Sequence, residues 1–185
     1  MKKGLKHLAV ISFLLVACGI FVTSGCSQPV KTLDPGVKGP QLIVNPVTVR
    51  LGVAKMKDTK LVFSGSGFEP GDSVFITLLN VPVDEKKVDL SIASADVEKD
   101  GTFNATVGLL TKVSDFLRAK IGSNEKMENI MIITQPPMPA GTYTAQAISM
   151  LSDNTADCIL NVKEPSWIDR LKDWLGVKMG KIVRK

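Results

Sequence analysis

Short segments of alternating hydrophobicity, separated by turn residues, constrain the fold of this chain more than any other feature of its sequence. Alternation places successive side chains on opposite faces of a strand. Pro70-Gly71 suits a type II turn, because proline presets φ and glycine accepts a positive φ, and Asp100-Gly101 is a hairpin signal. We expect strands at Leu42–Val44, Val47–Leu51, Lys60–Ser66, Ser73–Leu79, Val88–Val97, Thr102–Val107, Gly141–Met150 and Thr155–Lys163, the first two forming an edge strand that Pro46 interrupts. About seven short strands predict an all-β protein, a β-sandwich.

Part of this pattern resembles a known family. Phe63–Asp72, FSGSGFEPGD, is similar to the GxGFxPG(E/D) turn of bacterial extracellular immunoglobulin-like domains, including the IPT/TIG type. Asp100–Phe103, Pro139–Thr144 and Cys158–Val162 follow in that family's order, and we assign residues 41–164 to one such domain. The resemblance implies an immunoglobulin-like sandwich that serves as a spacer, binding module or adhesin segment and carries no catalytic residues. It also implies that Tyr143 packs at the corner where the penultimate strand begins.

The segment 109–138 departs from that family, in which a short connection is expected. Leu110, Val113, Leu117 and Ile121 recur at helical spacing. We therefore expect a helical insertion. It would either cap an open end of the sandwich or bind a partner or ligand, because specificity often resides in segments added to a stable scaffold.

The first 26 residues have the pattern of an export signal. Three lysines precede the apolar run Leu8–Val22, and small residues then lead into Cys26. The run is shorter than the roughly 20 residues of a membrane-spanning helix. Thr23-Ser24-Gly25-Cys26 resembles the lipobox of bacterial lipoproteins, a family in which the chain is cut before the cysteine and the cysteine is acylated. We expect residues 1–25 to be removed and the folded part to lie outside the cytoplasm.

Two cysteines compete for the lipid. Leu15-Val16-Ala17-Cys18 also fits the lipobox, and Leu15 suits its position better than Thr23 does. Cleavage at Cys18 would leave an apolar stub, residues 19–22, whereas Cys26 is followed directly by polar residues. We favour Cys26, with Cys18 as the alternative. A secretory signal without lipid and an uncleaved N-terminal anchor are the other interpretations.

Residues 26–40 are expected to form a flexible tether between the lipid and the domain. They are rich in proline, glycine and polar residues and carry no apolar periodicity. Fully extended, such a tether would reach about 45 Å.

Removal of residues 1–25 changes the composition of the working protein. It takes away three of the 23 basic residues, none of the 18 acidic ones and the only histidine, His7, so the net charge falls from +5 to +2. A chain without histidine has no Ser-His-Asp or Cys-His site and no His-ligated metal. Residues 27–165 contain 14 basic and 16 acidic residues, a slightly negative charge that gives no electrostatic footprint for nucleic acid. The remaining cysteine, Cys158, alternates with apolar residues and is expected inside a strand.

Asp96, Glu98 and Asp100 form the one dense acidic cluster. Calcium-binding loops also have carboxylates at alternate positions before a glycine. An EF-hand loop that began at Asp96 would, however, need a glutamate at its twelfth position, which is Val107. The expected turn already accounts for Asp100-Gly101. These residues are a weak metal candidate, and we expect no cofactor.

Residues 165–185 combine an amphipathic helix with a basic tail. Ser166 can cap a helix whose apolar face would consist of Trp167, Ile168, Leu171, Trp174 and Leu175. The basic residues beside and after this face are Lys178, Lys181, Arg184 and Lys185. Such a helix suits the headgroup region of an anionic bilayer, where each basic residue adds about 1 kcal/mol of attraction. The alternative is that the tryptophan face packs on the domain and the tail is solvated.

These expectations lead to a hypothesis of function. The chain would be a non-enzymatic, lipid-anchored protein of a bacterial cell membrane or outer membrane, whose immunoglobulin-like module binds or supports an envelope protein or polymer. Its membrane contacts would be the N-terminal lipid and the C-terminal helix, and no nucleic acid partner is expected. The alternatives are a carbohydrate- or small-ligand-binding module and a carboxylate-based hydrolase subunit.

Overall fold

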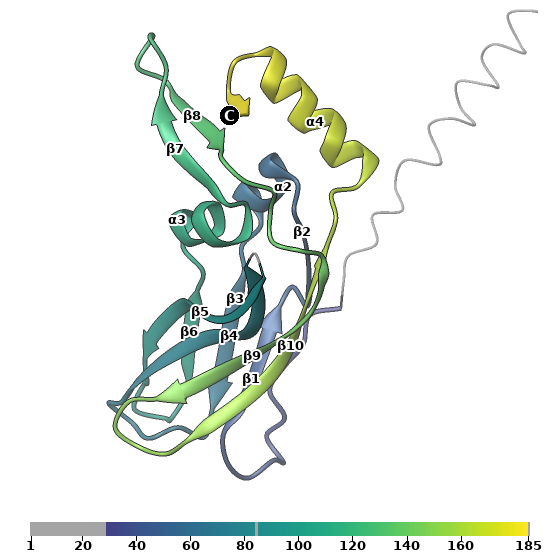
Figure 1. Ribbon diagram of the computed structural model, residues 1–185. Helices are drawn as coiled ribbons and strands as arrows, with labels where there is room; N and C mark the ends of the chain where they lie inside the picture. The colour runs from purple at the N-terminus through teal and green to yellow at the C-terminus, as the bar shows by residue number, and fades with distance from the viewer. Residues whose placement is uncertain (1–28, 84, 185) are drawn as a thin grey trace, which may run out of the picture.

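The computed structural model describes residues 29–83 and 85–184, and within them the strands form three sheets (Figure 1). The first has the order β1-β3-β6 and consists of β1 (Gln41–Asn45), β3 (Val62–Ser66) and β6 (Phe103–Thr106). The second has the order β2-β10-β9-β4-β5 and consists of β2 (Thr48–Arg50), β10 (Thr155–Lys163), β9 (Gly141–Ser149), β4 (Ser73–Val83) and β5 (Lys86–Asp96). Neighbours in these two sheets are antiparallel except β2, which runs parallel to β10. We call the two sheets together the β body. The β-rich class that the alternation predicted is confirmed.

One apolar core holds the β body together. Alternate residues of its strands are buried, and both sheets contribute side chains to the same core. Phe103 of β6 packs edge to face on Phe68, with ring centroids 5.1 Å apart. Its ring also covers Gly65 of β3, where an added Cβ would lie 2.2 Å from the ring. Gly65 therefore makes room for the largest side chain of β6.

The two predicted turns form, but one of them joins unexpected strands. Gly71 has a φ of +82°, and the N–H of Asp72 donates to the carbonyl of Glu69, as in a type II turn. Gly101 has a φ of +77°. However, the Asp100-Gly101 turn connects β5 of the five-stranded sheet with β6 of the three-stranded sheet. The expected hairpin is wrong because β5 pairs with β4 and β6 pairs with β3.

The insertion 109–138 is mostly a hairpin, and the helix expected to reach Ile121 is wrong beyond residue 116. Helical backbone is confined to α3 (Leu109–Thr111) and a π-helical turn, η1 (Lys112–Phe116). Arg118 then takes a left-handed φ of 48°, which ends it. The rest of the insertion is a hairpin of β7 (Ala119–Ser123) and β8 (Asn129–Ile133). The C-terminal strand β11 (Ile182–Arg184) pairs in parallel with β8, and the three strands form the third sheet, of order β11-β8-β7.

A short helix that the sequence did not predict, α2 (Val53–Asp58), lies between the β body and the C-terminal helix α4 (Trp167–Lys178) (Figure 1). Distant side chains cap both of its ends. The Asp173 carboxylate accepts from the N–H groups of Val53 (3.0 Å) and Ala54 (3.1 Å). The Lys112 ammonium donates to two carbonyls at the other end, those of residues 57 and 59. Burial lowers the pKa of Lys112. These contacts supply the partners that a short helix leaves unsatisfied at its termini.

Part of the expected tether is bound to the β body. The N–H of Lys31 donates to Oδ1 of Asn45 and its carbonyl accepts from Nδ2 of Asn45, both at 2.9 Å. The side chain of Gln41 likewise exchanges hydrogen bonds with the backbone of Asp34. Only the residues before Lys31 could therefore act as the expected tether, so its largest reach from Cys26 would be about 16 Å rather than about 45 Å.

A buried carboxylate, Asp72, closes the predicted Pro70-Gly71 turn. Asp72 is 2% exposed and accepts hydrogen bonds from the Ser149 hydroxyl and from the N–H groups of Ser73 (2.6 Å) and Leu151 (3.1 Å). The bond from Ser149, aided by the backbone donors, outweighs burial and holds the pKa of Asp72 below its ordinary value.

Acid is expected to weaken the fold through Asp72. A carboxylate with a lowered folded pKa stabilises the protein above its unfolded pKa, about 3.9, and this stabilisation is lost as the pH falls through the folded pKa. Asp72→Asn should lower the Tm by roughly 5 °C near neutral pH, and the difference from wild type should narrow below about pH 4. Thermal unfolding followed by circular dichroism measures both, with Asp153→Asn, an exposed acid, as control. A difference that stays constant down to about pH 2 would contradict this account.

Candidate membrane-contact site

The start of α4 is fixed by a complete capping box. The Ser166 hydroxyl accepts from the N–H of Asp169 (3.2 Å), and the Asp169 carboxylate accepts from the N–H of Ser166 (2.9 Å). Burial by itself would raise the pKa of Asp169, but the hydrogen bonds from Ser166 hold it below its ordinary value. Ser166 therefore caps the helix as its sequence position predicted.

This helix packs on the protein through its polar edge. Asp169 packs closely on Gly52: a Cβ added at residue 52 would lie only 2.7 Å from the Cβ of Asp169. One turn later, Asp173 caps α2. Gly176 completes the edge, where an added Cβ would lie 2.7 Å from Ile182 of β11. Within α4 only these three residues, Asp169, Asp173 and Gly176, are buried.

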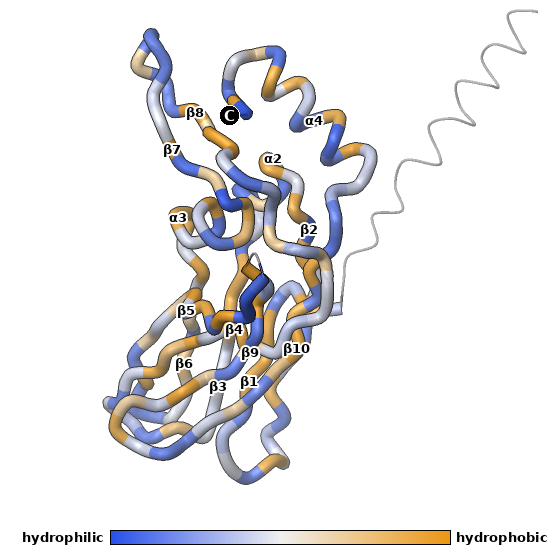
Figure 2. Tube along the Cα trace, viewed as in Figure 1, coloured by the Kyte–Doolittle hydropathy of each residue, from blue (hydrophilic) through white to orange (hydrophobic). Residues whose placement is uncertain are grey.

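The apolar face of α4 is exposed to solvent. Trp167 is 74% exposed, Trp174 is 54% exposed, and Ile168, Leu171 and Leu175 are between 44% and 48% exposed. Because successive helical residues are about 100° apart, these five side chains lie opposite the buried edge. Figure 2 shows hydrophobic positions recurring along α4, which lies at one end of the molecule with α2 beneath it in Figure 1. The described residues of the domain therefore leave the tryptophan face largely uncovered. Exposed apolar surfaces rimmed by charged residues are typical of interaction sites.

Positive side chains flank the exposed face on both sides. The Lys178 ammonium lies 5.9 Å from the centre of the Trp174 ring, within the range of a cation–π contact. On one side of the face, Arg170 and Arg184 line a cavity of about 530 Å³ together with Trp174. Lys172 lies on the opposite side of the face. Since both acidic residues of α4 are buried, every charged side chain that α4 exposes is positive.

The backbone of the basic tail is folded up to Arg184, and the side chains of Lys181 and Arg184 stay exposed to solvent. Gly180, with a φ of +68°, donates to the carbonyl of Val177, and Lys181 donates to that of Gly176, which is the Schellman pattern. The chain then returns as β11. Ile182 is buried, and the Lys181 ammonium pairs with Glu128 at 3.0 Å. Lys185 lies outside the described residues.

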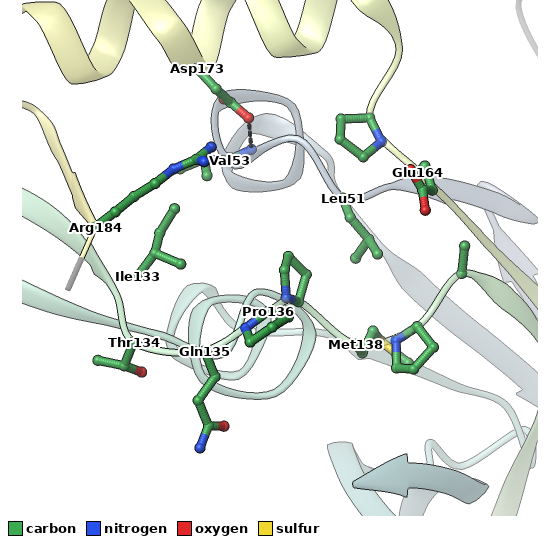
Figure 3. Close-up of a pocket in the computed structure, with 14 residues that line it drawn as sticks. Leu51, Val53, Ile133, Thr134, Gln135, Pro136, Met138, Glu164, Asp173 and Arg184 are labelled. Atoms are coloured by element: carbon green, nitrogen blue, oxygen red, sulfur yellow. Dashed lines mark hydrogen bonds between the residues drawn. The ribbon is translucent and has the colours of Figure 1, made fainter. Parts of the chain in front are cut away.

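A cavity of about 550 Å³ lies between α4, β8 and the β body (Figure 3). Its walls are mainly apolar and include the Pro136–Pro139 segment. The side chain of Arg184 lies on one side of it and points toward Val53 (Figure 3). The two lining carboxylates already have partners, since Asp173 caps α2 and Glu164 pairs with Arg170 at 3.1 Å. The cavity thus offers apolar contact and one guanidinium, which suits binding rather than acid–base chemistry.

The other candidate residues are placed apart from α4. Asp96 accepts from Ser73 (2.7 Å) and Asp100 from the N–H and hydroxyl of Thr102, whereas Glu98 is exposed. Within residues 29–83 and 85–184, no group of three potential ligands could hold a metal ion. Burial raises the pKa of the Cys158 thiol to about 12, so it is a poor nucleophile. Cys26 and Cys18 lie outside the described residues.

Sequence reasoning placed the five apolar residues correctly on one face but missed three neighbours. Arg170 and Lys172 were not among the candidate contacts, although their positions on the helix, on either side of the apolar strip, could have indicated them. The role of Asp173 had no such signal, because α2 was not predicted.

No family model matches the chain, and no curated protein matches it. Among the described residues, the helices are too short or too polar to cross a membrane.

Proposed function

We propose that this chain is a non-enzymatic, lipid-anchored protein of the bacterial cell envelope whose helix α4 lies on an anionic membrane surface. One observation carries the proposal: α4 packs on the protein through its acidic edge and exposes its tryptophan-bearing face between positive flanks. A helix of this composition fits the interfacial plane of a bilayer. The buried carboxylates Asp72, Asp169 and Asp173 are all used to hold backbone N–H groups, which supports a binding role over catalysis.

We also propose that the β body is an immunoglobulin-like sandwich. The strand orders support this, because β1-β3-β6 corresponds to the A, B and E strands of such domains and β10-β9-β4-β5 to G, F, C and C′. The hydroxyl of Tyr143, near the start of β9, donates to the carbonyl of Pro139 at 2.7 Å. This contact resembles the tyrosine corner of that fold.

The two proposed membrane contacts would lie at the same end of the molecule. Lys31 is hydrogen-bonded to Asn45. The residues that follow Asn45 run beside β10, where the carbonyl of Val47 accepts from the N–H of Asn161. Ser166, the start of α4, follows only five residues later. Cys26 could reach about 16 Å from Lys31, and the five residues from Asn161 to Ser166 span at most about the same distance. A lipid at Cys26 and the α4 face could therefore engage one bilayer together.

Two weak membrane signals acting together give firm binding. Acyl chains and a basic apolar surface each bind reversibly, and stable anchoring takes two such signals. Each lysine or arginine beside an anionic surface adds about 1 kcal/mol, screened by salt. The positive flanks of α4 therefore predict a preference for anionic lipid and a loss of binding at high salt.

Vesicle flotation of residues 27–185 without the lipid tests the contact of α4. We expect the protein to float with phosphatidylcholine vesicles that contain phosphatidylglycerol, and to bind pure phosphatidylcholine about tenfold more weakly. Trp167→Ser with Trp174→Ser should abolish flotation. Phe75→Ser with Ile159→Ser, which removes partly exposed apolar side chains from the β body, is the matched control and should float.

Point variants are preferable to deletion of α4, because Asp173 is needed to cap α2. Flotation of the tryptophan variant equal to that of wild type would overturn the contact, and so would wild-type protein that fails to float. Far-ultraviolet circular dichroism of each variant checks that α4 is retained.

A further inference from the structure

A second apolar surface adjoins the exposed face of α4. A groove of about 500 Å³ lies between α4, α2 and the hairpin β7–β8, a volume in the usual range of ligand sites. Its apolar lining includes Leu109, Ile121, Ile130, Met131 and Met179. Leu109 and Ile121 are both 41% exposed and Met179 is 67% exposed. The apolar lining of the groove is therefore open to solvent.

Lysines supply the charge of this groove. Lys57 of α2, Lys172 of α4 and Lys181 line it, and no acidic side chain of the described residues does so. Lys181 is paired with Glu128. The ammonium groups of Lys57 and Lys172 make no hydrogen bond or ion pair with another described residue. Two unpaired ammonium groups thus lie beside the apolar groove. This combination complements a molecule that has an apolar chain and a negatively charged head.

The groove is continuous with the face that we place on the membrane. Lys172 and Met179 lie within about 60° of Ile168 and Leu175 around the axis of α4. A lipid in contact with the exposed face would therefore meet the groove at the side of the same helix.

We propose that this groove binds one acyl chain of an anionic membrane lipid, whose negative head faces Lys57 and Lys172. Burial of apolar surface along the groove would drive binding, and the two lysines would select a charged head over a neutral one. The proposal rests on the proposed function for the source of the lipid, but it can fail while the membrane contact of α4 holds.

A soluble probe separates the groove from the membrane surface. Residues 27–185 are titrated, without vesicles, with cis-parinaric acid, a fluorescent long-chain fatty acid, and with its uncharged methyl ester. We expect saturable binding of one acid per protein, with an affinity about tenfold higher than that of the ester. Lys57→Gln with Lys172→Gln should lower the affinity for the acid to that for the ester and leave binding of the ester unchanged.

Variants of the groove locate the bound chain. Leu109→Gln with Ile121→Gln should weaken binding of both probes at least about tenfold. Met179→Glu should do the same and, because Met179 is largely exposed, does not endanger folding. Trp167→Ser with Trp174→Ser is the matched control, which should bind the acid as wild type does although it no longer floats.

The outcomes of the two assays are distinguishable. Absence of probe binding by wild type, or equal binding by Met179→Glu and wild type, would overturn the groove proposal, whatever the flotation result. Loss of probe binding in the tryptophan variant would likewise overturn it, because the chain would then lie on the exposed face. Probe binding by a wild-type protein that fails to float would overturn the membrane contact and leave the groove supported.

Discussion

Replacing Phe103 with alanine is expected to lower the free energy of unfolding by about 4 kcal/mol. The ring is 1% exposed and forms an edge-to-face contact with Phe68. Its loss removes that contact and leaves a cavity between the two sheets, which strands held in hydrogen-bonded ladders can close only in part. Urea denaturation should show a lower midpoint at an unchanged m value. A loss below about 1 kcal/mol would contradict the central place of this ring.

The same contact predicts a second variant and its rescue. Gly65→Ala should cost about 2 kcal/mol, because the new Cβ would lie 2.2 Å from the Phe103 ring. Gly65→Ala combined with Phe103→Leu should then lose less than the sum of the two single variants, since leucine vacates part of that space. Gly108→Ala is the matched control: Gly108 has an ordinary φ of −65°, and its nearest neighbour would be 3.9 Å away. Additive losses would show that Gly65 is needed for another reason.

Asp173→Ala is expected to cost about 3 kcal/mol. The variant would leave the N–H groups of Val53 and Ala54 without acceptors at the start of α2, and Gly52 has no side chain that could replace the cap. It would also remove the main polar contact between α2 and α4. Denaturation by urea measures the loss, and Asp153→Ala, an exposed acid of the β9–β10 turn, is the control.

Asp173→Asn refines this test. The amide oxygen of asparagine can accept from one of the two N–H groups but carries no charge. The free energy of unfolding of Asp173→Asn should therefore lie between those of the wild type and Asp173→Ala. Flotation should persist in both variants, because the apolar face of α4 does not depend on Asp173. Asp173→Asn and Asp173→Ala losing the same stability would show that charge, rather than the number of hydrogen bonds, is what caps α2.

Most strands of the β body could be predicted because one face of each is buried, which forces alternation. Thr155–Lys163 has the predicted bounds, and Ser73–Leu79 extends to Val83 past Asn80, a residue with a positive φ at a shift in register. Alternation does not reveal which strand lies alongside. For that reason, the Asp100-Gly101 turn was taken for a hairpin, although β5 and β6 belong to different sheets.

The candidate site was predictable in composition but not in orientation. Helical periodicity identified the apolar strip of α4, whereas the side that faces the protein is decided by a bond between Asp173 and Val53, 120 residues apart. In the insertion, Val113, Phe116 and Leu117 are buried as the helical periodicity predicts, but the prediction fails at Ile121. Ile121 instead joins a strand, because the run Ile130–Ile133 provides a partner for it.

The parallel pairing of β11 with β8 has a mechanical consequence. α4 is attached to the protein at its start through β10 and at its end through this ladder, so it cannot roll about its own axis or swing away. A bilayer resting on its apolar face would therefore set the tilt of the whole β body. If α4 lies on a bilayer as proposed, the β8–β11 ladder would fix the orientation of the β body, and the outer surface of the five-stranded sheet would always face the same direction relative to that bilayer.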